Sequence, residues 1–415
     1  MSTREMKDSG IEWIGEIPKG WEVCFIKQIL RNKSIKGFPN EEVLSLYRDY
    51  GIVPKSSRDD NHNVTSDDTN GYKLVEVGDF VINKMKAWQG SMALSNYRGI
   101  ISPAYYICTF VNDNAHKRYI HYLLRNETYK AEYLRLSTGL RVGQWDLNIN
   151  DFLCIKTLLP PMEEQHRIAT FLDEKCKDID TLITLQEEMI AELQVYKQSV
   201  ISEAVTKGLN PNVAMKDSGV KWIGKIPSKW ELLPVKFIFS NLDYLREPIS
   251  AEQRSRKNPH YDYYGASGVI DKIDYYNVND KVLLIGEDGA NLLLRNLPLI
   301  YKAEGKFWVN NHAHILKPIK DDYDYLSYIM EAADYTTSIT GSAQPKLSQS
   351  KLSNIKLCIP PLSEQRQIAD YLDTKCSQID ELIALKQQKI TELQDYKKSL
   401  IYEYVTGKKE VPANN

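Results

Sequence analysis

The chain has 415 residues, of which 42% are hydrophobic and 26% charged, and its formal net charge at pH 7 is −2. This length exceeds one ordinary hydrophobic core and suits two domains or more. No apolar run approaches the ~20 residues of a membrane span, and the N-terminal stretch lacks the apolar core of a secretory signal. The six cysteines occur singly, which disfavours disulfide scaffolds and zinc sites.

One phrase near the start of the chain returns near its middle. "MKDSGIEWIGEIPKGWE" begins at Met6 and "MKDSGVKWIGKIPSKWE" at Met215, with 12 of 17 positions identical. The stretches that follow, 23–158 and 232–359, differ in sequence but share an order of short β-like runs, a short helical run and a glycine-containing loop. We therefore predict one type of mixed α/β domain used twice, with two different surfaces.

A second duplication covers residues 160–206 and 360–406, with 26 of 47 positions identical and no gap. After an opening Pro-Pro, neither copy contains Gly or Pro, and apolar residues follow a 4-3-4-3 spacing that is typical of a coiled coil. Helices of this length rise ~66 Å, so we expect an antiparallel pair that acts as a rigid spacer. The predicted helix–helix seam consists of Leu172, Ile179, Ile183, Ile190, Leu193, Val200, Leu372, Ile379, Ile383, Ile390, Leu393 and Leu400.

Polar residues interrupt this seam at matching places, with Gln186 and Lys386 at one level and Lys197 and Lys397 at another. Two interpretations are open. The lysines belong to an imperfect seam from which their charged ends reach water, or they fix the register of the two helices.

Charge is divided unevenly along the chain. Residues 23–158 hold 18 basic and 14 acidic side chains and residues 232–359 hold 15 of each, whereas residues 160–206 hold 4 and 10. The acidity therefore lies in the helices. Because salt screens charges over ~8–10 Å, the variable domains can bind nucleic acid within an acidic chain. The alternative is that their basic clusters are ordinary solvated surface.

The chain contains none of several common catalytic motifs. It lacks a P-loop, an Asn-Pro-Pro-aromatic run, a Gly-x-Ser-x-Gly elbow and a His-Glu-x-x-His helix. Glu287 and Asp288 in "GEDGAN" are interpreted as an acidic turn rather than a metal site. His312 and His314 alternate along an expected strand and so face opposite sides, which disfavours a shared metal.

The repeated motifs resemble those of one known family. "WIGEIPKGW" and "WIGKIPSKW", with "LPPMEEQHRIATFLD" and "IPPLSEQRQIADYLD", resemble the specificity subunits of type I restriction–modification systems over nearly the whole chain. The resemblance implies an α+β fold, in which two mixed α/β target-recognition domains are joined by two long antiparallel coiled-coil helices in a pseudo-two-fold circular repeat. The expected parts are domains at 1–159 and 208–359, helices at 160–207 and 360–407, and a tail at 408–415.

The resemblance also implies a function. Such a subunit is non-catalytic, and each variable domain reads one half of a bipartite, asymmetric site in double-stranded DNA. The helices set the spacer and dock two modification (methyltransferase) subunits, while separate restriction/translocase subunits cleave the DNA. S-adenosylmethionine, ATP and Mg²⁺ are expected on those partners, no cofactor or metal in this chain, no membrane contact, and a cytoplasmic location. Two alternatives are the specificity part of a fused endonuclease–methyltransferase and a coiled-coil adaptor that binds only proteins.

Candidate DNA-reading residues follow from chemistry, because Arg, Lys, Asn and Gln read base edges best. Most candidates lie in loops beside glycines. "GSAQPKLS" at 341–348 resembles the loop that closes such a domain, whereas "GLRVGQWDLN" at 139–148 departs from it. The candidates are Lys84, Lys86, Gln89, Arg141 and Gln144 in the first domain, and Arg254, Arg256, Asn291, Gln344 and Lys346 in the second.

The two ends of the sequence complete a third copy of the connector. "VTGKKEVPANN" followed by "MSTREMKDSGIEWIG" repeats the middle segment "VTKGLNPNVAMKDSGVKWIG" with a few extra residues. We therefore expect one unit used twice in a ring that is cut open at one connector. Met1 and Asn415 should lie close together, with Trp13 and Trp222 as packing anchors.

Overall fold

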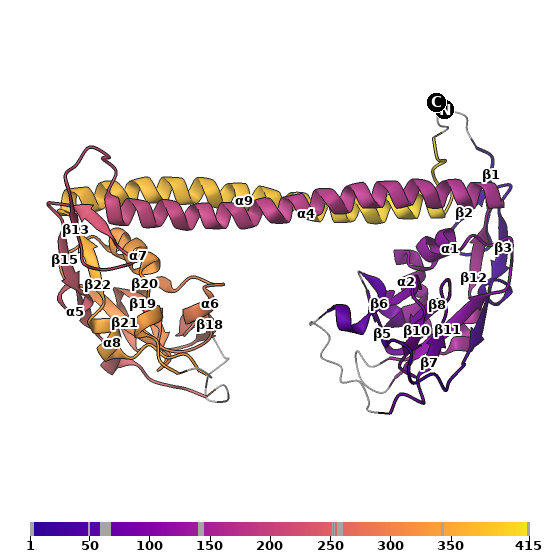
Figure 1. Ribbon diagram of the computed structural model, residues 1–415, viewed down its shortest axis with the longest axis horizontal. Coiled ribbons are helices and arrows are strands. Elements are labelled where there is room, and N and C mark those ends of the chain that lie inside the picture. Colours follow the sequence, from indigo (N-terminus) through magenta and orange to yellow (C-terminus); the bar gives the residue numbers. More distant parts are fainter. Residues whose placement is uncertain are drawn as a thin grey trace. The chain divides into compact units, whose positions relative to one another are not determined.

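The chain forms two compact units that do not follow sequence order. The computed structural model describes residues 4–48, 50–58, 68–139, 145–250, 252, 254, 260–341 and 344–412. One unit contains Met1–Gln186 and Gln388–Asn415, and the other contains Glu187–Gln387 (Figure 1). Each unit holds one variable domain and part of both long helices. The division into successive domains and helices therefore describes the sequence, whereas the compact units cut across both helices.

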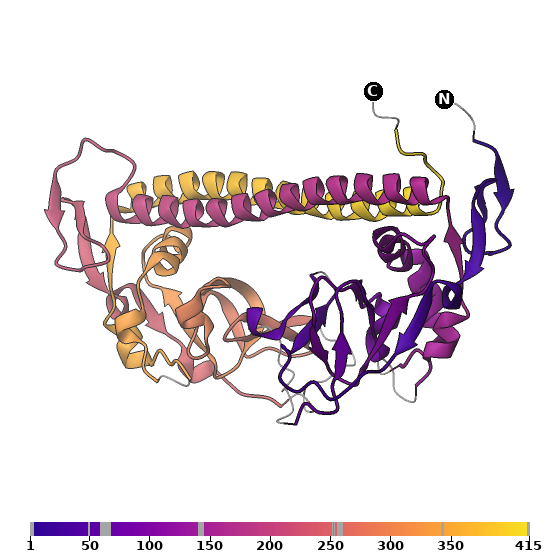
Figure 2. The ribbon, with the colours of Figure 1, turned by 45° about the vertical axis from the view of Figure 1, so that its right-hand side comes forward.

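The two long helices are α4, Met162–Lys207, and α9, Leu362–Val405 (Figure 2). In the first unit Lys397 Nζ donates to Asp180 Oδ1 at 2.6 Å. In the second unit Lys197 Nζ donates to Asp380 Oδ1 at 2.7 Å. Residue numbers rise along one helix as they fall along the other, so the helices run antiparallel within each unit.

These ion pairs bear on the polar interruptions of the seam. Lys197 and Lys397 do reach toward water, but each ends on an aspartate of the opposite helix. Each exposed pair contributes only ~0.2–1 kcal/mol, yet both would be lost if the helices slipped. The matched pairs therefore favour register control.

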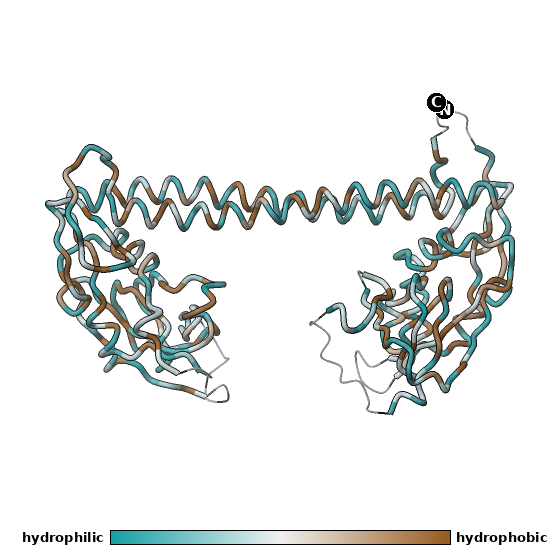
Figure 3. Tube along the Cα trace, in the orientation of Figure 1, coloured by the Kyte–Doolittle hydropathy of each residue, from teal (hydrophilic) through white to brown (hydrophobic). Residues whose placement is uncertain are grey.

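The seam residues are unequally buried, and hydrophobic residues recur along both helices (Figure 3). Those nearest the variable domains join their cores: Leu172, Ile179 and Leu400 in the first unit, and Leu372 in the second. Ile379 and Ile390 are also buried. The half-buried ones are Ile183, Ile190, Leu193, Val200, Ile383 and Leu393.

The first variable domain is built on a four-stranded sheet of order β4-β11-β8-β9, with four two-stranded ladders, β1-β2, β3-β12, β5-β6 and β7-β10, beside it. Short helices follow β11. The strands are β1 Met6–Asp8, β2 Glu16–Pro18, β3 Glu22–Phe25, β4 Leu30–Lys33, β5 Leu44–Tyr47, β6 Gly51–Pro54, β7 Lys73–Val75, β8 Phe80–Asn83, β9 Met92–Leu94, β10 Gly99–Ile101, β11 Tyr105–Phe110 and β12 Lys156–Leu159; the helices are α1 Lys117–Leu124, α2 Glu127–Leu136 and α3 Ile149–Leu153.

The second variable domain has a six-stranded sheet of order β16-β21-β19-β20-β17-β18. The β17–β18 hairpin joins it through a parallel pairing of β17 with β20. The strands are β13 Met215–Asp217, β14 Lys225–Pro227, β15 Glu231–Pro234, β16 Phe239–Asn241, β17 Tyr261–Gly265, β18 Gly268–Ile273, β19 Val278–Gly286, β20 Ile300–Val309, β21 Ala313–Pro318 and β22 Lys356–Ile359; the helices are α5 Val235–Ile238, α6 Asn291–Leu294, α7 Tyr323–Ala332 and α8 Gln349–Ser353.

The two domains share one arrangement despite their different sequences. The order β4-β11-β8-β9 corresponds to β16-β21-β19-β20, and the strand before each long helix pairs antiparallel with the strand after each repeated phrase. The predicted α+β fold, with two mixed domains and two long antiparallel helices, is confirmed.

A three-part joint forms where each long helix begins. Trp21 Nε1 donates to Glu164 Oε2 at 2.9 Å, and Trp230 Nε1 donates to Glu364 Oε2 at 3.0 Å. Both tryptophans are fully buried. Trp13 and Trp222, predicted as the anchors, pack on the same cores but are only half-buried.

The third part of each joint is the glycine that ends the other helix. Gly407 has φ +72° and Gly208 has φ +76°, the left-handed conformation that glycine supplies at a helix C-terminus. A Cβ at Gly407 would lie 2.4 Å from Pro18 Cδ, and one at Gly208 would lie 3.1 Å from Trp230 Cζ2. The backbone conformation therefore favours glycine at both positions, and at Gly407 the space beside Pro18 also excludes a Cβ.

The glutamine of the Glu-Gln signature ties each long helix to its variable domain. Gln165 is fully buried; its Oε1 accepts from His116 N at 2.8 Å, and its Nε2 donates to the carbonyls of Asn114 and Pro160. Gln365 makes the corresponding bonds to Asp322 N, Pro360 O and Asp321 Oδ1.

Residues after α9 return to the first unit's N-terminal segment. Lys408 Nζ donates to the carbonyls of Ile14 and Glu16, and Val411 packs on the first core. Met1 and Asn415 lie outside the described residues, so their proximity stays a prediction. Within the described ranges, no helix has the length and apolar character needed to span a bilayer.

The Gln165 contacts predict a local effect of one substitution. Gln165→Ala leaves the Asn114 and Pro160 carbonyls and the His116 amide without these partners, at a cost of about 1–3 kcal/mol for each buried group left unpaired. We expect a lower thermal midpoint and faster amide exchange in the peptide 114–124, measured by hydrogen–deuterium exchange and mass spectrometry.

The matched control is Gln198→Ala, an exposed position on the same helix. It should leave both measurements unchanged. Equal effects of the two variants would contradict a specific role for Gln165.

Candidate nucleic-acid interface

Two loops meet at the end of a central strand in the first domain. The 3₁₀ helix Lys84–Gln89 directly follows β8. A second loop is closed where Asp146 N donates to Thr138 O at 2.8 Å and Thr138 N donates to Asp146 O at 3.1 Å. Leu147 N then donates to Lys84 O at 3.2 Å and fastens the two loops together.

The second domain repeats this arrangement with other residues. Lys346 N donates to Thr340 O at 2.8 Å, Thr340 N donates to Lys346 O at 2.9 Å, and Leu347 N donates to Glu287 O at 2.7 Å. Glu287 follows β19 as Lys84 follows β8. The loop at 139–148, which departs in sequence from its counterpart, is therefore closed by the same backbone pairing.

The first-domain candidates Lys84, Lys86 and Gln89 share the 3₁₀ helix. Asn83 Oδ1 accepts from Met85 N at its start. Lys86 is exposed and Gln89 half-buried, while Lys84 Nζ lies 4.7 Å from the centroid of the Tyr106 ring. Arg141 and Gln144 lie outside the described residues.

Basic and aromatic side chains gather around these loops. Lys73 Nζ lies 5.7 Å from the Tyr106 ring centroid and donates to Tyr105 O at 2.6 Å. Burial lowers the pKa of Lys73, and the nearby positive charges of Lys84 and Lys36 lower it further. Such a concentration of positive charge is relieved by a phosphate.

The second-domain candidates Gln344 and Lys346 both lie in the loop closed by Thr340. Gln344 is exposed. Lys346 is 55% exposed, and its Nζ lies 3.1 Å from Glu287 Oε1. The loop therefore presents one exposed amide beside an ammonium group that is already paired.

The remaining second-domain candidates lie elsewhere or are engaged. Asn291 Nδ2 donates to the carbonyls of Leu297 and Pro298, and its Oδ1 accepts from Leu297 N, so this amide shapes its own loop. Arg254 Nη1 donates to Asp271 Oδ2 at 2.9 Å on the β17–β18 hairpin. The structure thus does not join Arg254 to the Gln344 loop, and Arg256 lies outside the described residues.

His314 lies on β21, whereas His312 lies in the turn just before that strand rather than on it. Asp288 Oδ2 lies 2.7 Å from His312 Nδ1, and Glu287 pairs with Arg246 and Lys346. The His312 side chain is 47% exposed and that of His314 is fully buried, so they face opposite sides. Among the described residues, no three His, Cys, Asp or Glu side chains are grouped to hold a metal.

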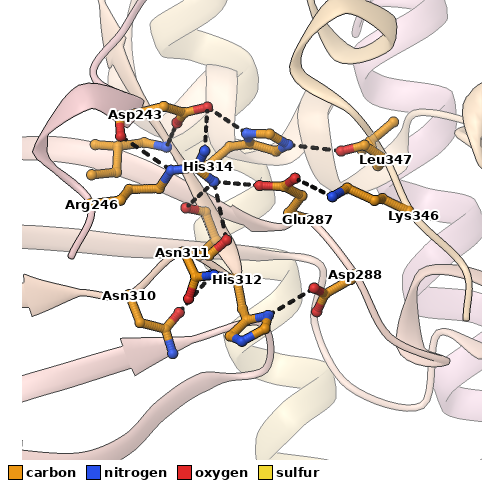
Figure 4. Close-up of polar contacts among 12 residues, drawn as sticks. Asp243, Arg246, Glu287, Asp288, Asn310, Asn311, His312, His314, Lys346 and Leu347 are labelled. Carbon is orange, nitrogen blue, oxygen red and sulfur yellow. Dashed lines mark hydrogen bonds and ion pairs between the residues drawn. The ribbon is translucent and has the colours of Figure 1, made fainter. Parts of the chain in front are cut away.

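Sequence reasoning missed several residues of this region. Lys73 lies on β7, before the Lys84–Gln89 helix, and Tyr106 lies on β11, after it. In the second domain, the partly buried Asp243 and Arg246 and the fully buried His314 form a polar network (Figure 4). Their spacing in the sequence carries no motif. The alternation of His312 and His314 was the available signal, because it indicates that one of the two faces inward, and the structure shows that this one is His314.

The crowding of positive charge predicts a change in one titration. Lys84→Gln removes one of the charges that lower the pKa of Lys73, so that pKa should rise. Lys86→Gln, two residues further along, should leave it unchanged. The measurement is the titration of lysine 13Cε resonances by NMR, and an equal shift in both variants would contradict the proposed proximity effect.

Comparison with known protein families and sequences identifies related proteins over nearly the whole chain. A model of the type I restriction modification DNA specificity domain matches residues 18–194 and 227–395. The chain is 26% identical over 441 residues to the type I restriction enzyme MjaVIII specificity subunit of Methanocaldococcus jannaschii, covering 94% of this chain and 93% of that protein.

Two solved structures share the fold. One comes from a study of complex assembly and conformational transition of the type I R-M system. The two structures match over 94% of this chain and 98% of that chain, with a TM-score of 0.70 and 15% sequence identity. The other is the HsdS subunit from Thermoanaerobacter tengcongensis, which matches over 96% of this chain and 99% of that chain, with a TM-score of 0.50 and 14% sequence identity. The chain belongs to the family of type I restriction–modification DNA specificity subunits.

Proposed function

We propose that each target-recognition domain reads one half of a bipartite DNA site with the two loops at the end of its central strand. One observation carries this proposal: the same pair of loops is fastened at the same strand end in both domains, but with different side chains. A shared backbone frame with unlike exposed side chains suits two unlike DNA sequences. Lys86 and Gln344 are exposed candidates in the two domains, and Lys346, which is also exposed, is paired with Glu287.

The rest of the complex follows from membership of the family. We propose that α4 and α9, which contribute to both units, set the length of DNA between the half-sites and dock two modification subunits. The chemistry then belongs to partners: S-adenosylmethionine on the modification subunits, and ATP and Mg²⁺ on restriction/translocase subunits. The absence of P-loop and Asn-Pro-Pro-aromatic motifs in the sequence supports a non-catalytic role. Such a complex acts on DNA in the cytoplasm.

The test separates the two half-sites. The chain is assembled with its modification subunits, and the methylated motif is determined by sequencing of methylated DNA. Lys86→Ala should relax base preference in one half-site only, and Gln344→Ala in the other only. One base contact of about 1–3 kcal/mol corresponds to roughly 5- to 150-fold in preference.

The control variant is Lys229→Ala, an exposed lysine of the repeated phrase. It should leave both half-sites unchanged. The proposal fails if Lys86→Ala and Gln344→Ala alter the same half-site, or if neither alters any position while methylation continues.

A further inference from the structure

A set of polar contacts around the buried side chain of His314 lies at the base of the Gln344 loop in the second target-recognition domain. His314 of β21 is fully buried; its Nδ1 lies 2.6 Å from Asp243 Oδ2 and its Nε2 lies 2.8 Å from Leu347 O (Figure 4). Leu347 is the residue directly after the backbone pair that closes the loop. His314 therefore links the sheet to the base of the loop through a side chain.

The hydrogen-bond partners of His314 determine which of its ring nitrogens carry a hydrogen. A carbonyl oxygen can only accept, so Nε2 carries a hydrogen. Burial by itself would raise the pKa of Asp243, but bonds from His314 and from Ile315 N bring that pKa below its ordinary value. Asp243 is then a carboxylate, and Nδ1 carries a hydrogen as well. The imidazolium form of His314 makes both bonds at once.

Three other charged side chains, Arg246, Glu287 and Lys346, form ion pairs next to the His314–Asp243 pair. Arg246 Nη2 lies 3.5 Å from Asp243 Oδ2, and Arg246 Nη1 lies 2.5 Å from Glu287 Oε2. Burial acts to raise the pKa of Glu287, but its bonds from Arg246 and Lys346 and the charge of His314 lower it. The network thus contains two carboxylates and three cations, which satisfies the requirement that buried charges be paired.

The same network fastens the loop at a second point. Glu287 O accepts from Leu347 N, Gly289 N donates to Pro345 O at 3.0 Å, and Lys346 Nζ lies 3.1 Å from Glu287 Oε1. The ammonium group of Lys346, a candidate DNA-reading residue, is thus already paired with a carboxylate of the protein. Gln344 lies in the loop that these contacts hold, and its side chain is exposed.

The first domain has a different side chain at the corresponding position. His314 pairs with Ile285 in the β21–β19 ladder, two residues before Glu287. Tyr106 pairs with Ile82 in the β11–β8 ladder, two residues before Lys84. Because Tyr106 occupies the place of His314, the imidazolium brace belongs to the second domain alone, and so should its effect on DNA reading.

We propose that His314 is a positioning residue for the second half-site: paired with Asp243, it holds Leu347 and thereby sets the loop that carries Gln344 in the conformation that reads DNA. The inference rests on the proposed function, because it assumes that this loop meets the bases. It assigns His314 no contact with DNA.

The test compares two substitutions of His314 with different hydrogen-bonding reach. The amide nitrogen of glutamine can take the place of Nε2 and donate to Leu347 O, whereas that of asparagine takes the place of Nδ1 and reaches only Asp243. In the assembled complex, His314→Asn should weaken base preference at the second half-site by roughly tenfold. His314→Gln should retain more of that preference, and the first half-site should stay unchanged in both.

Lys317→Ala is the matched control, because Lys317 lies on the same strand, is 47% exposed and pairs with Asp280. It should alter neither half-site. If Gln344→Ala changes the second half-site while His314→Asn does not, or if the Gln and Asn variants behave alike, the positioning role is refuted and the proposed function stands. If loop variants in neither domain change any position, the proposed function itself fails.

A second measurement applies even where a His314 variant fails to fold. The histidine 15N ring resonances of the unmodified protein report whether each nitrogen carries a hydrogen, and the folded His314→Gln variant or selective labelling assigns the His314 pair. Both ring nitrogens of His314 should carry a hydrogen in the native protein, because one faces the Asp243 carboxylate and the other the Leu347 carbonyl oxygen. A neutral ring with one bare nitrogen would overturn the inference.

Discussion

The bond between a buried indole and a glutamate at the start of each long helix fixes how a target-recognition domain sits on its own helices. Trp21 meets Glu164 and Trp230 meets Glu364, and in each joint the glycine that ends the other helix packs against the tryptophan or its neighbours. A carboxylate in the first turn of a helix is also favoured by the helix dipole. The repeated phrase and the Pro-Pro-x-x-Glu-Gln signature are thus the two sides of one contact, which explains why both occur twice.

Because this joint and the buried glutamines hold each domain on its helices, the side chains of the loops that we propose to read DNA are free to vary. In both domains the loops are fastened through backbone groups, at Thr138 and Asp146 or at Thr340 and Lys346, and through a buried leucine. Backbone hydrogen bonds do not depend on side-chain identity. Side chains that face outward from these loops can therefore change without loss of the fold, while buried braces such as His314 must change together with the loop they hold.

The repeats in the sequence predicted the helices and domains, whereas the contacts around the candidate loops depend on tertiary structure. The 4-3-4-3 spacing and the opening Pro-Pro indicate two long helices with a seam, because helical periodicity is a local property. The Trp–Glu contacts could not be predicted from the sequence, because Trp21 and Trp230 are more than a hundred residues away from their glutamates along the chain. The loop candidates Lys86 and Gln344 are exposed, whereas Asn291 and Arg254 are engaged in local contacts that depend on tertiary structure. His314 needed its buried partners before its role became visible.

The central claim is that the chain is one unit used twice, closed by the same joint at both connectors. Circular permutation tests this claim most directly: residues 415 and 1 are joined by a short linker and the chain is reopened near Asn210, after α4. Because each joint is made by side chains that permutation leaves in place, the permuted protein should direct methylation to the same DNA motif with the same gap between half-sites. A permuted protein that is soluble and still assembles with modification subunits, yet methylates a different motif or none, would contradict the account.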